Sequence, residues 1–142
     1  MTLWILDTDC VSLFLEGNQQ IGKEAAAKFP DVGITIVTVQ EIFNGWVGRI
    51  NDPSQAHQLV SLYTKLWRAT EFFKRVTIFN FNETSQIYHA NLLAENKLLA
   101  KKRLEKDTRI AAIVLANNGI MVTRNRKDFS LIPSLQIEDW TC

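Results

Sequence analysis

The chain has 142 residues, of which 46% are hydrophobic and 22% are charged, a balance typical of one globular domain with a substantial core. The net charge of +1 gives no indication of a nucleic-acid partner, and two cysteines are too few for a disulfide framework. No apolar run is long enough to cross a membrane and no signal peptide is recognisable, so we expect a cytoplasmic protein without a membrane partner.

The first half of the chain alternates between strand and helix patterns. A short apolar run, Leu3–Leu6, predicts a buried strand that ends in Asp7, and one or two short helices are expected between Thr8 and Lys28. Ile34–Val37 predicts the second strand. The helix from Thr38 to Ile50 carries one apolar stripe. Thr38 is placed to cap it, with Glu41 at the spacing of a capping box.

The second half continues the alternation. A long helix is expected after Pro53, followed by a strand at Val76–Phe79 and a helix from Asn82, capped by Asn82 or Thr84, to about Leu99. Asp107 opens a helix that is apolar nearly all round and therefore buried, and Asn117-Asn118-Gly119 stops it. The last two strands are expected at Ile120–Thr123 and Leu135–Ile137.

This alternation predicts an α/β fold: a three-layer α/β/α domain over residues 1–142, with a central, mainly parallel sheet of about five short strands. No linker or internal repeat divides the chain. In such sheets the carboxyl ends of the strands lie at one edge, which is where ligands bind. Residues that follow the strands are therefore the candidates for a functional site.

Acidic and amide side chains fall at that predicted edge. Asp7, Glu41 and Asp107 are joined there by Asn125 and Asp128, which follow the fourth strand. A cluster of carboxylates is costly unless a cation neutralises it, and a set of oxygen ligands without His or Cys suits Mg²⁺ or Mn²⁺.

Each of the four acidic residues also has a purely structural interpretation. Asp7 and Asp107 could simply cap helices, Glu41 could only complete a capping box, and Asp128 could be a surface turn residue. Capping and ion binding can coexist, because a helix N-terminus favours an ionised carboxylate.

Two further patterns concern binding. Basic residues crowd two stretches, each of which is either a solvated surface or a phosphate-binding one: Lys97, Lys101, Lys102, Arg103, Lys106 and Arg109, then Arg124, Arg126 and Lys127. Gly45 and Gly48 share a helix face with Glu41, which indicates either close approach of a ligand or tight packing against a neighbouring helix. Trp46 and Trp67 fit apolar stripes and are expected in the core.

At these residues the chain resembles PIN-domain ribonucleases of the VapC toxin type. The resemblance spans nearly the whole chain and rests on the order and spacing of five segments: Leu6-Asp7-Thr8-Asp9, Thr38-Val39-Gln40-Glu41, Asp107-Thr108-Arg109-Ile110-Ala111-Ala112, Val122-Thr123-Arg124-Asn125-Arg126-Lys127-Asp128-Phe129 and Ile137-Glu138-Asp139-Trp140.

The resemblance implies a Mg²⁺-dependent endoribonuclease, with a tRNA substrate in the subgroup that this chain is most similar to. It also implies a homodimer and an inhibitory VapB-type antitoxin. Asp7, Glu41 and Asp107 match the family's metal-binding positions, while Asn125 stands where an Asp is common. Lys101–Lys106 replaces a Gly-containing segment. Arg124, Arg126, Lys127, Lys102, Arg103 and Arg109 are the candidates for holding RNA phosphates.

Two rival functions fit parts of the same pattern. A catalytically degenerate PIN domain would bind RNA or a partner without cutting, and Asn125 favours that alternative. Asp7-Thr8-Asp9 also matches the DxD start of a HAD-type phosphatase, although Lys127-Asp128 substitutes poorly for the catalytic Lys and late acidic pair of that class.

Overall fold

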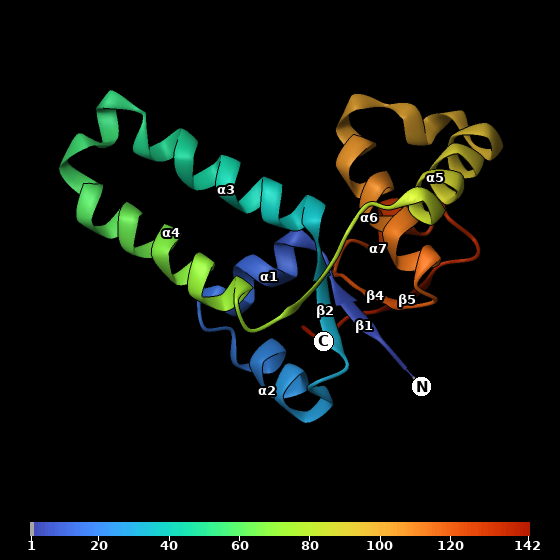
Figure 1. The fold of residues 1–142 in the computed structure, drawn as a ribbon, viewed down its shortest axis with the longest axis horizontal. Helices are drawn as coiled ribbons and strands as arrows, with labels where there is room; N and C mark the ends of the chain where they lie inside the picture. The colour runs from blue at the N-terminus through green and yellow to red at the C-terminus, as the bar shows by residue number, and fades with distance from the viewer. Residues whose placement is uncertain (1) are drawn as a thin grey trace.

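The computed structural model describes residues 2–142 and contains one five-stranded sheet (Figure 1). Its strands are β1 (Trp4–Leu6), β2 (Val32–Thr35), β3 (Thr77–Phe79), β4 (Ile120–Val122) and β5 (Gln136–Glu138). Their order across the sheet is β3-β2-β1-β4-β5, and every neighbouring pair is parallel. The predicted α/β class and parallel sheet are confirmed.

Helices connect the strands and flank the sheet (Figure 1). The α-helices are α1 (Thr8–Leu15), α2 (Gln19–Lys28), α3 (Ile36–Ile50), α4 (Leu59–Phe73), α5 (Glu83–Glu95), α6 (Glu105–Ala116) and α7 (Arg126–Phe129). Short 3-10 helices are η1 (Pro53–Gln58), η2 (Lys97–Ala100) and η3 (Lys102–Leu104). No helix within residues 2–142 is both long enough and apolar enough to span a membrane.

Successive side chains of β1 point into two separate hydrophobic cores. Ile5 belongs to a core with α5, α6 and α7, whereas Leu6 belongs to a second core with α1, α2 and part of α3 and α4. This alternation is the period of two that a strand imposes. α6 is apolar nearly all round, and Ile110 to Val114 are fully buried, as predicted. Asn118, with a φ of 53°, follows its last turn.

Two helix starts differ from the sequence prediction. α3 begins at Ile36, because the Thr35 hydroxyl caps it by accepting a hydrogen bond from the backbone N–H of Thr38 at 3.2 Å. The second strand therefore ends before Ile36, and the predicted Thr38–Glu41 capping box is wrong. α6 begins at Glu105 behind Leu104, which makes no side-chain cap. Asp107 therefore lies in the first turn of α6 and is not its N-cap.

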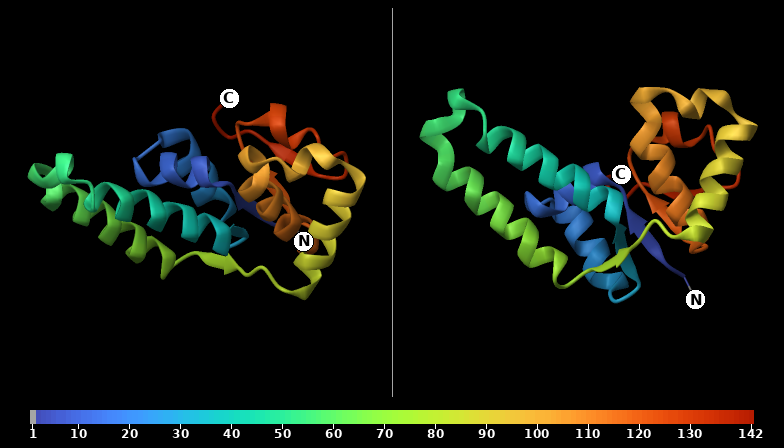
Figure 2. Two further views of the ribbon diagram at one scale, coloured as in Figure 1. Left: turned by 90° about the horizontal axis from the view of Figure 1, so that it is seen from above. Right: turned by 45° about the horizontal axis from the view of Figure 1, so that its top comes forward.

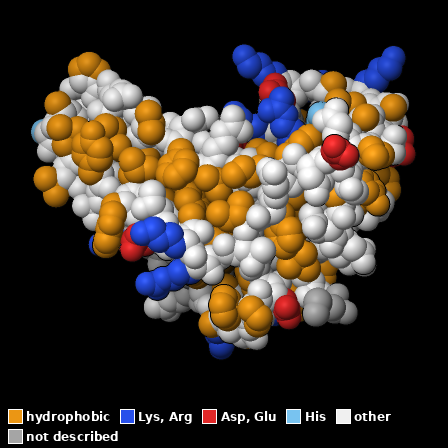
Figure 3. Space-filling view, in the orientation of Figure 1, with side chains coloured by type: hydrophobic (Ala, Val, Ile, Leu, Met, Phe, Trp, Pro, Cys, Tyr) orange, Lys and Arg blue, Asp and Glu red, His pale blue; other side chains and the backbone are white. Residues whose placement is uncertain are grey.

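α3, η1 and α4 form a helical arm that extends away from the sheet in the ribbon views of Figure 1 and Figure 2. Phe43 and Phe73 join its two helices, with ring centroids 5.5 Å apart. On the face shown in Figure 3, hydrophobic side chains gather over this arm. Trp67 is 60% exposed, so its predicted place in the core is wrong. Gly45 and Gly48 face open space, which excludes the tight-packing alternative.

Candidate active site

The carboxyl edge of the sheet carries an open cleft of about 610 Å³, here called the acidic cleft. It is lined by Asp7, Thr8, Asp9, Glu41, Asp107, Arg124 and Asn125. These residues come from the ends of β1 and β4 and from the first turns or first half of α1, α3 and α6. The structure therefore brings together all four residues predicted to be catalytic.

Asp7 is the buried floor of the acidic cleft, with 5% of its surface exposed. Its Oδ1 accepts a hydrogen bond from the Cys10 N–H at 2.8 Å and so caps α1, and its Oδ2 accepts one from the Thr123 hydroxyl at 2.6 Å. Burial raises the pKa of Asp7, and these hydrogen bonds oppose the rise. The capping and cleft-lining interpretations therefore both hold.

Glu41 is positioned by a relay of hydroxyl groups. The Thr8 hydroxyl donates to Glu41 Oε1 at 2.6 Å and lies 3.0 Å from the Thr38 hydroxyl. Because the single hydroxyl hydrogen of Thr8 goes to Glu41, Thr38 is the donor in the second contact. The relay fixes a carboxylate of α3 against the first residue of α1.

Asp107 shows that the carboxylates of the cleft repel one another. Its pKa is raised from 3.8 to about 6, mainly by burial and further by the negative charges of Glu41, Asp7 and Asp128, while Arg103 opposes the rise. A carboxylate that neighbouring carboxylates destabilise gains from a cation placed among them. The donor set therefore fits a divalent ion.

The four predicted catalytic residues do not by themselves form a complete metal-coordination site. Within residues 2–142, no group of three or more His, Cys, Asp or Glu side chains is arranged to hold a metal ion directly. Mg²⁺ commonly takes one or two protein carboxylates and keeps several of its waters. An ion bound here would therefore be held partly through water.

Asn125 is engaged by Asp128. Asn125 caps the short helix α7, and its Nδ2 donates to Asp128 Oδ2 at 3.0 Å. Arg103 Nη1 donates to the same oxygen at 2.9 Å. These hydrogen bonds lower the pKa of Asp128, whose side chain is only 14% exposed. Asp128 is therefore not a simple surface turn residue, because it ties the segment before α6 to Asn125.

The predicted phosphate-binding residues are divided among several places. Arg124 lines the acidic cleft, where Asp9 binds it, and Arg103 reaches the cleft's edge through Asp128. Arg109 pairs with Glu105, and Arg126 lines a different pocket beside Asp139 and Trp140. Lys102 and Lys127 are exposed. In Figure 3, basic side chains project from the corner formed by the η2–η3 segment.

Sequence reasoning missed the hydroxyl groups that hold the carboxylates. Leu6 pairs with Val122 in the β1–β4 ladder, so the next residues, Asp7 and Thr123, lie side by side. Thr8 and Thr123 both lie in segments that resemble the VapC type, but no role is predicted for either from the sequence. Their positions could have indicated this role, because Thr123 directly follows a strand and Thr8 directly follows Asp7.

Replacing Thr123 with valine should lower the free energy of unfolding by about 1–3 kcal/mol, because it removes a donor from buried Asp7 and the acceptor of the Asn125 N–H. Chemical denaturation measures this. Thr108→Val is the matched control: Thr108 is also buried and its hydroxyl donates only to backbone carbonyls. Both variants should lose stability, but only Thr123→Val should also weaken divalent-ion binding. Equal ion binding by the two would contradict the role given to Thr123.

Comparison with known proteins gives relatives in sequence that are named Ribonuclease VapC. No protein-family model matches the chain. It is 35% identical to Ribonuclease VapC2 of Rickettsia felis over 72 residues, a match that spans about half of each protein (49% of this chain and 52% of the relative). It is 24% identical to Ribonuclease VapC1 of Haemophilus influenzae over 143 residues, which covers 98% of both.

Solved structures with a similar fold include VapBC complexes. A chain of the DNA-bound VapBC from Salmonella typhimurium gives a TM-score of 0.75 at 22% identity, with 99% of both chains covered. A chain of the R. felis VapBC2 complex gives a TM-score of 0.76 at 22% identity, with 98% of this chain and 99% of that chain covered. In sequence and in fold the chain is similar to the VapC proteins, and the resemblance predicted from its motifs is confirmed.

Proposed function

We propose that the chain is a divalent-metal-dependent endoribonuclease and the toxin of a toxin–antitoxin pair. The observation that carries this proposal is the acidic cleft, which Asp7, Glu41 and Asp107 line from three separate elements. Burial there, together with the charges of Glu41 and Asp7, raises the pKa of Asp107. Similarity to proteins named Ribonuclease VapC supports RNA as the substrate.

Asp7, Glu41 and Asp107 would hold Mg²⁺, with Mn²⁺ as a substitute, directly or through water. When bound, the ion supplies an activated water and neutralises charge on the phosphodiester in the transition state. Thr123 and Thr8 orient the Asp7 and Glu41 carboxylates by hydrogen bonds of 2.6 Å each. Asn125 adds no charge, and its amide is held by Asp128.

RNA would reach the cleft across its basic surroundings. Arg124 lies in the cleft itself, and Arg103 binds Asp128, which in turn holds the cleft residue Asn125. Lys102 and Lys127 are exposed neighbours of Arg103 and Asp128 in the chain. Contacts of this kind bind phosphates and carry little sequence information. We propose a structured RNA, tRNA in particular, as the substrate, and the cytoplasm as the place of action.

The test is to incubate the purified protein with bulk tRNA and Mg²⁺ or Mn²⁺ and to map the cut ends. Cleavage at defined positions that stops when EDTA removes the ion is expected. RNA that binds but stays intact would favour the degenerate PIN domain. A HAD-type phosphatase would instead trap a fluoroberyllate on Asp7, whose two carboxylate oxygens both accept hydrogen bonds here.

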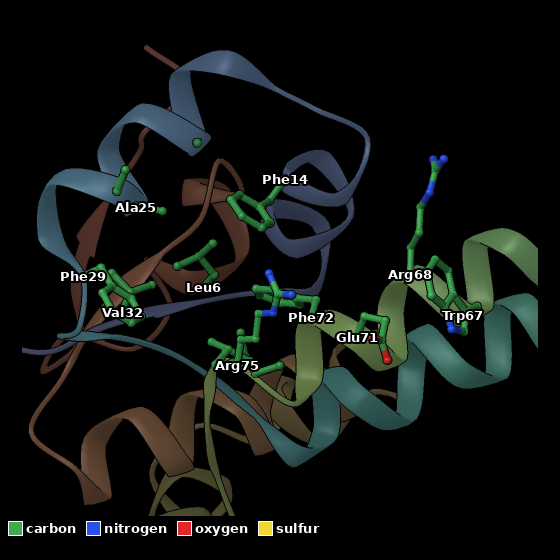
Figure 4. A pocket seen from close by; sticks show the side chains of 14 residues that line it. Leu6, Phe14, Ala25, Phe29, Val32, Trp67, Arg68, Glu71, Phe72 and Arg75 are labelled. Atoms are coloured by element: carbon green, nitrogen blue, oxygen red, sulfur yellow. The ribbon is translucent and has the colours of Figure 1, made fainter.

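An apolar pocket of about 590 Å³ supports the proposal that an antitoxin binds this chain. It lies between α1, α2, β2 and α4 and is lined mainly by apolar side chains, among them Leu6, Phe14, Phe29 and Phe72 (Figure 4). Arg68 and Arg75 stand along its α4 side. The solved relatives are complexes with VapB. We therefore propose that an apolar segment of a VapB-type antitoxin, flanked by acidic residues, binds there. A homodimer is proposed on the resemblance alone.

The α2 helix offers a matched pair of variants for this partner. Ala26 lines the apolar pocket and Ala27, the next residue, does not, while both are exposed. Ala26→Arg should prevent co-purification of the antitoxin encoded beside this chain, because it places a charge in the apolar pocket, and Ala27→Arg should not. Equal antitoxin recovery with both variants would exclude this pocket.

A further inference from the structure

One ion pair at the acidic cleft remains outside the proposed ion-binding set. Arg124 Nε donates to Asp9 Oδ2 at 2.6 Å and Arg124 Nη2 donates to Asp9 Oδ1 at 3.2 Å. The pair joins the first turn of α1 to the segment after β4, and the side chain of Asp9 is 47% exposed and that of Arg124 51%. An ion pair this exposed contributes little to stability. The position of the pair in the cleft therefore indicates a role in binding rather than in stability.

Asp9 occupies the part of Arg124 that a phosphate would use. A guanidinium binds a phosphate best through two parallel N–H groups of one edge, which is how Asp9 binds Arg124. Arg124 is also the only Lys or Arg among the described residues that line the cleft, beside Asp7, Asp9, Glu41 and Asp107. While Asp9 holds it, the cleft offers an RNA phosphate no uncompensated positive side chain.

We propose that Asp9 competes with RNA for Arg124. This inference rests on the proposed ribonuclease function and adds to it a residue that sets RNA affinity. On binding, an RNA phosphate replaces the Asp9 carboxylate on Nε and Nη2 of Arg124, and Asp9 is released to solvent. Asp9 thereby lowers the affinity of any RNA that places a phosphate at Arg124, because the Asp9–Arg124 pair must be broken first.

RNA affinity of single and double variants tests this competition. Binding of fluorescently labelled bulk tRNA is measured in EDTA, so that the RNA stays intact. Asp9→Asn should bind tRNA about three- to tenfold tighter than wild type, and the salt dependence of binding should steepen by about one phosphate contact. Arg124→Gln should abolish most of this gain, so Asp9→Asn/Arg124→Gln should differ from Arg124→Gln by less than about twofold.

Glu71→Gln is the matched control. It removes one negative charge and releases Lys74 from an exposed ion pair on α4, outside the acidic cleft. Its affinity for tRNA should change by less than about twofold. Weaker or unchanged tRNA binding by Asp9→Asn overturns the competition. An equal gain in affinity when Arg124 is already replaced also overturns it, because loss of a negative charge alone would then explain the gain. If no variant binds RNA in EDTA, wild type included, there is no RNA for Asp9 to compete with and the inference fails, whereas the proposed function is judged separately by cleavage with Mg²⁺ or Mn²⁺.

Discussion

Replacing Asp7 with asparagine should reduce RNA cleavage by more than about 100-fold without loss of the fold. Changes around a metal ligand alone cost about 10- to 100-fold in affinity or activity, and loss of the ligand's charge should exceed that. Asparagine keeps the oxygen that caps α1 through the Cys10 N–H. It also relieves the burial of a charge, which is what raises the pKa of Asp7. Cleavage assays and thermal melting measure the two effects.

Asp52→Asn is the control for this variant. Asp52 is also an N-capping aspartate, since its Oδ1 accepts a hydrogen bond from the Ser54 N–H at 3.0 Å, but it directly precedes η1, in the arm. It should cleave RNA like wild type. Cleavage by Asp7→Asn at the wild-type rate would show that the acidic cleft is not the catalytic site.

Replacing Asp107 with asparagine should stabilise the ion-free protein at neutral pH. The folded state raises the pKa of Asp107 from 3.8 to about 6. The unfolded chain therefore releases this proton more readily, and the native state loses stability as pH rises between these values. Asparagine removes that loss, which amounts to about 3 kcal/mol for a fully shielded group. Asp107 is partly exposed, so the expected gain is about 1–2 kcal/mol.

The pH dependence of this gain identifies its cause. Below about pH 3 Asp107 is protonated in both states, so wild type and Asp107→Asn should unfold alike. The difference should grow as pH rises from the unfolded-state pKa of 3.8 to the folded-state pKa of about 6, and stay constant above it. Glu105→Gln, two residues earlier and in an exposed pair with Arg109, should change stability by less than about 0.5 kcal/mol. A gain for Asp107→Asn that persists unchanged at low pH would show that charge repulsion is not its source.

The strands and the parallel sheet were predictable because apolar, β-branched runs alternate with helical stripes. The boundary after β2 was not. Ile36 and Val37 continue a strand-like run, yet the Thr35 hydroxyl caps a helix whose buried residues are Val37, Thr38 and Ile42. Helix starts thus depended on which hydroxyl reached a backbone N–H. At α6 no side chain caps the helix at all.

The acidic residues of the site followed from topology alone, since Asp7, Glu41 and Asp107 each follow or begin elements at one sheet edge. Their supporting contacts did not follow. The Thr123–Asp7 and Arg124–Asp9 contacts join residues 116 and 115 positions apart, and they depend on the β1–β4 register and on side-chain direction. Asn125 was identified, but its engagement by Asp128 was not visible in the sequence.

Binding of a divalent cation in the acidic cleft is tested most directly by calorimetric titration of the protein with Mn²⁺ near neutral pH. Wild type and Asp52→Asn should bind the ion alike, while Asp7→Asn and Asp107→Asn should bind it more than about tenfold more weakly. Absence of Mn²⁺ binding by the wild type, or equal binding by all four proteins, would contradict the assignment of these carboxylates to a metal site.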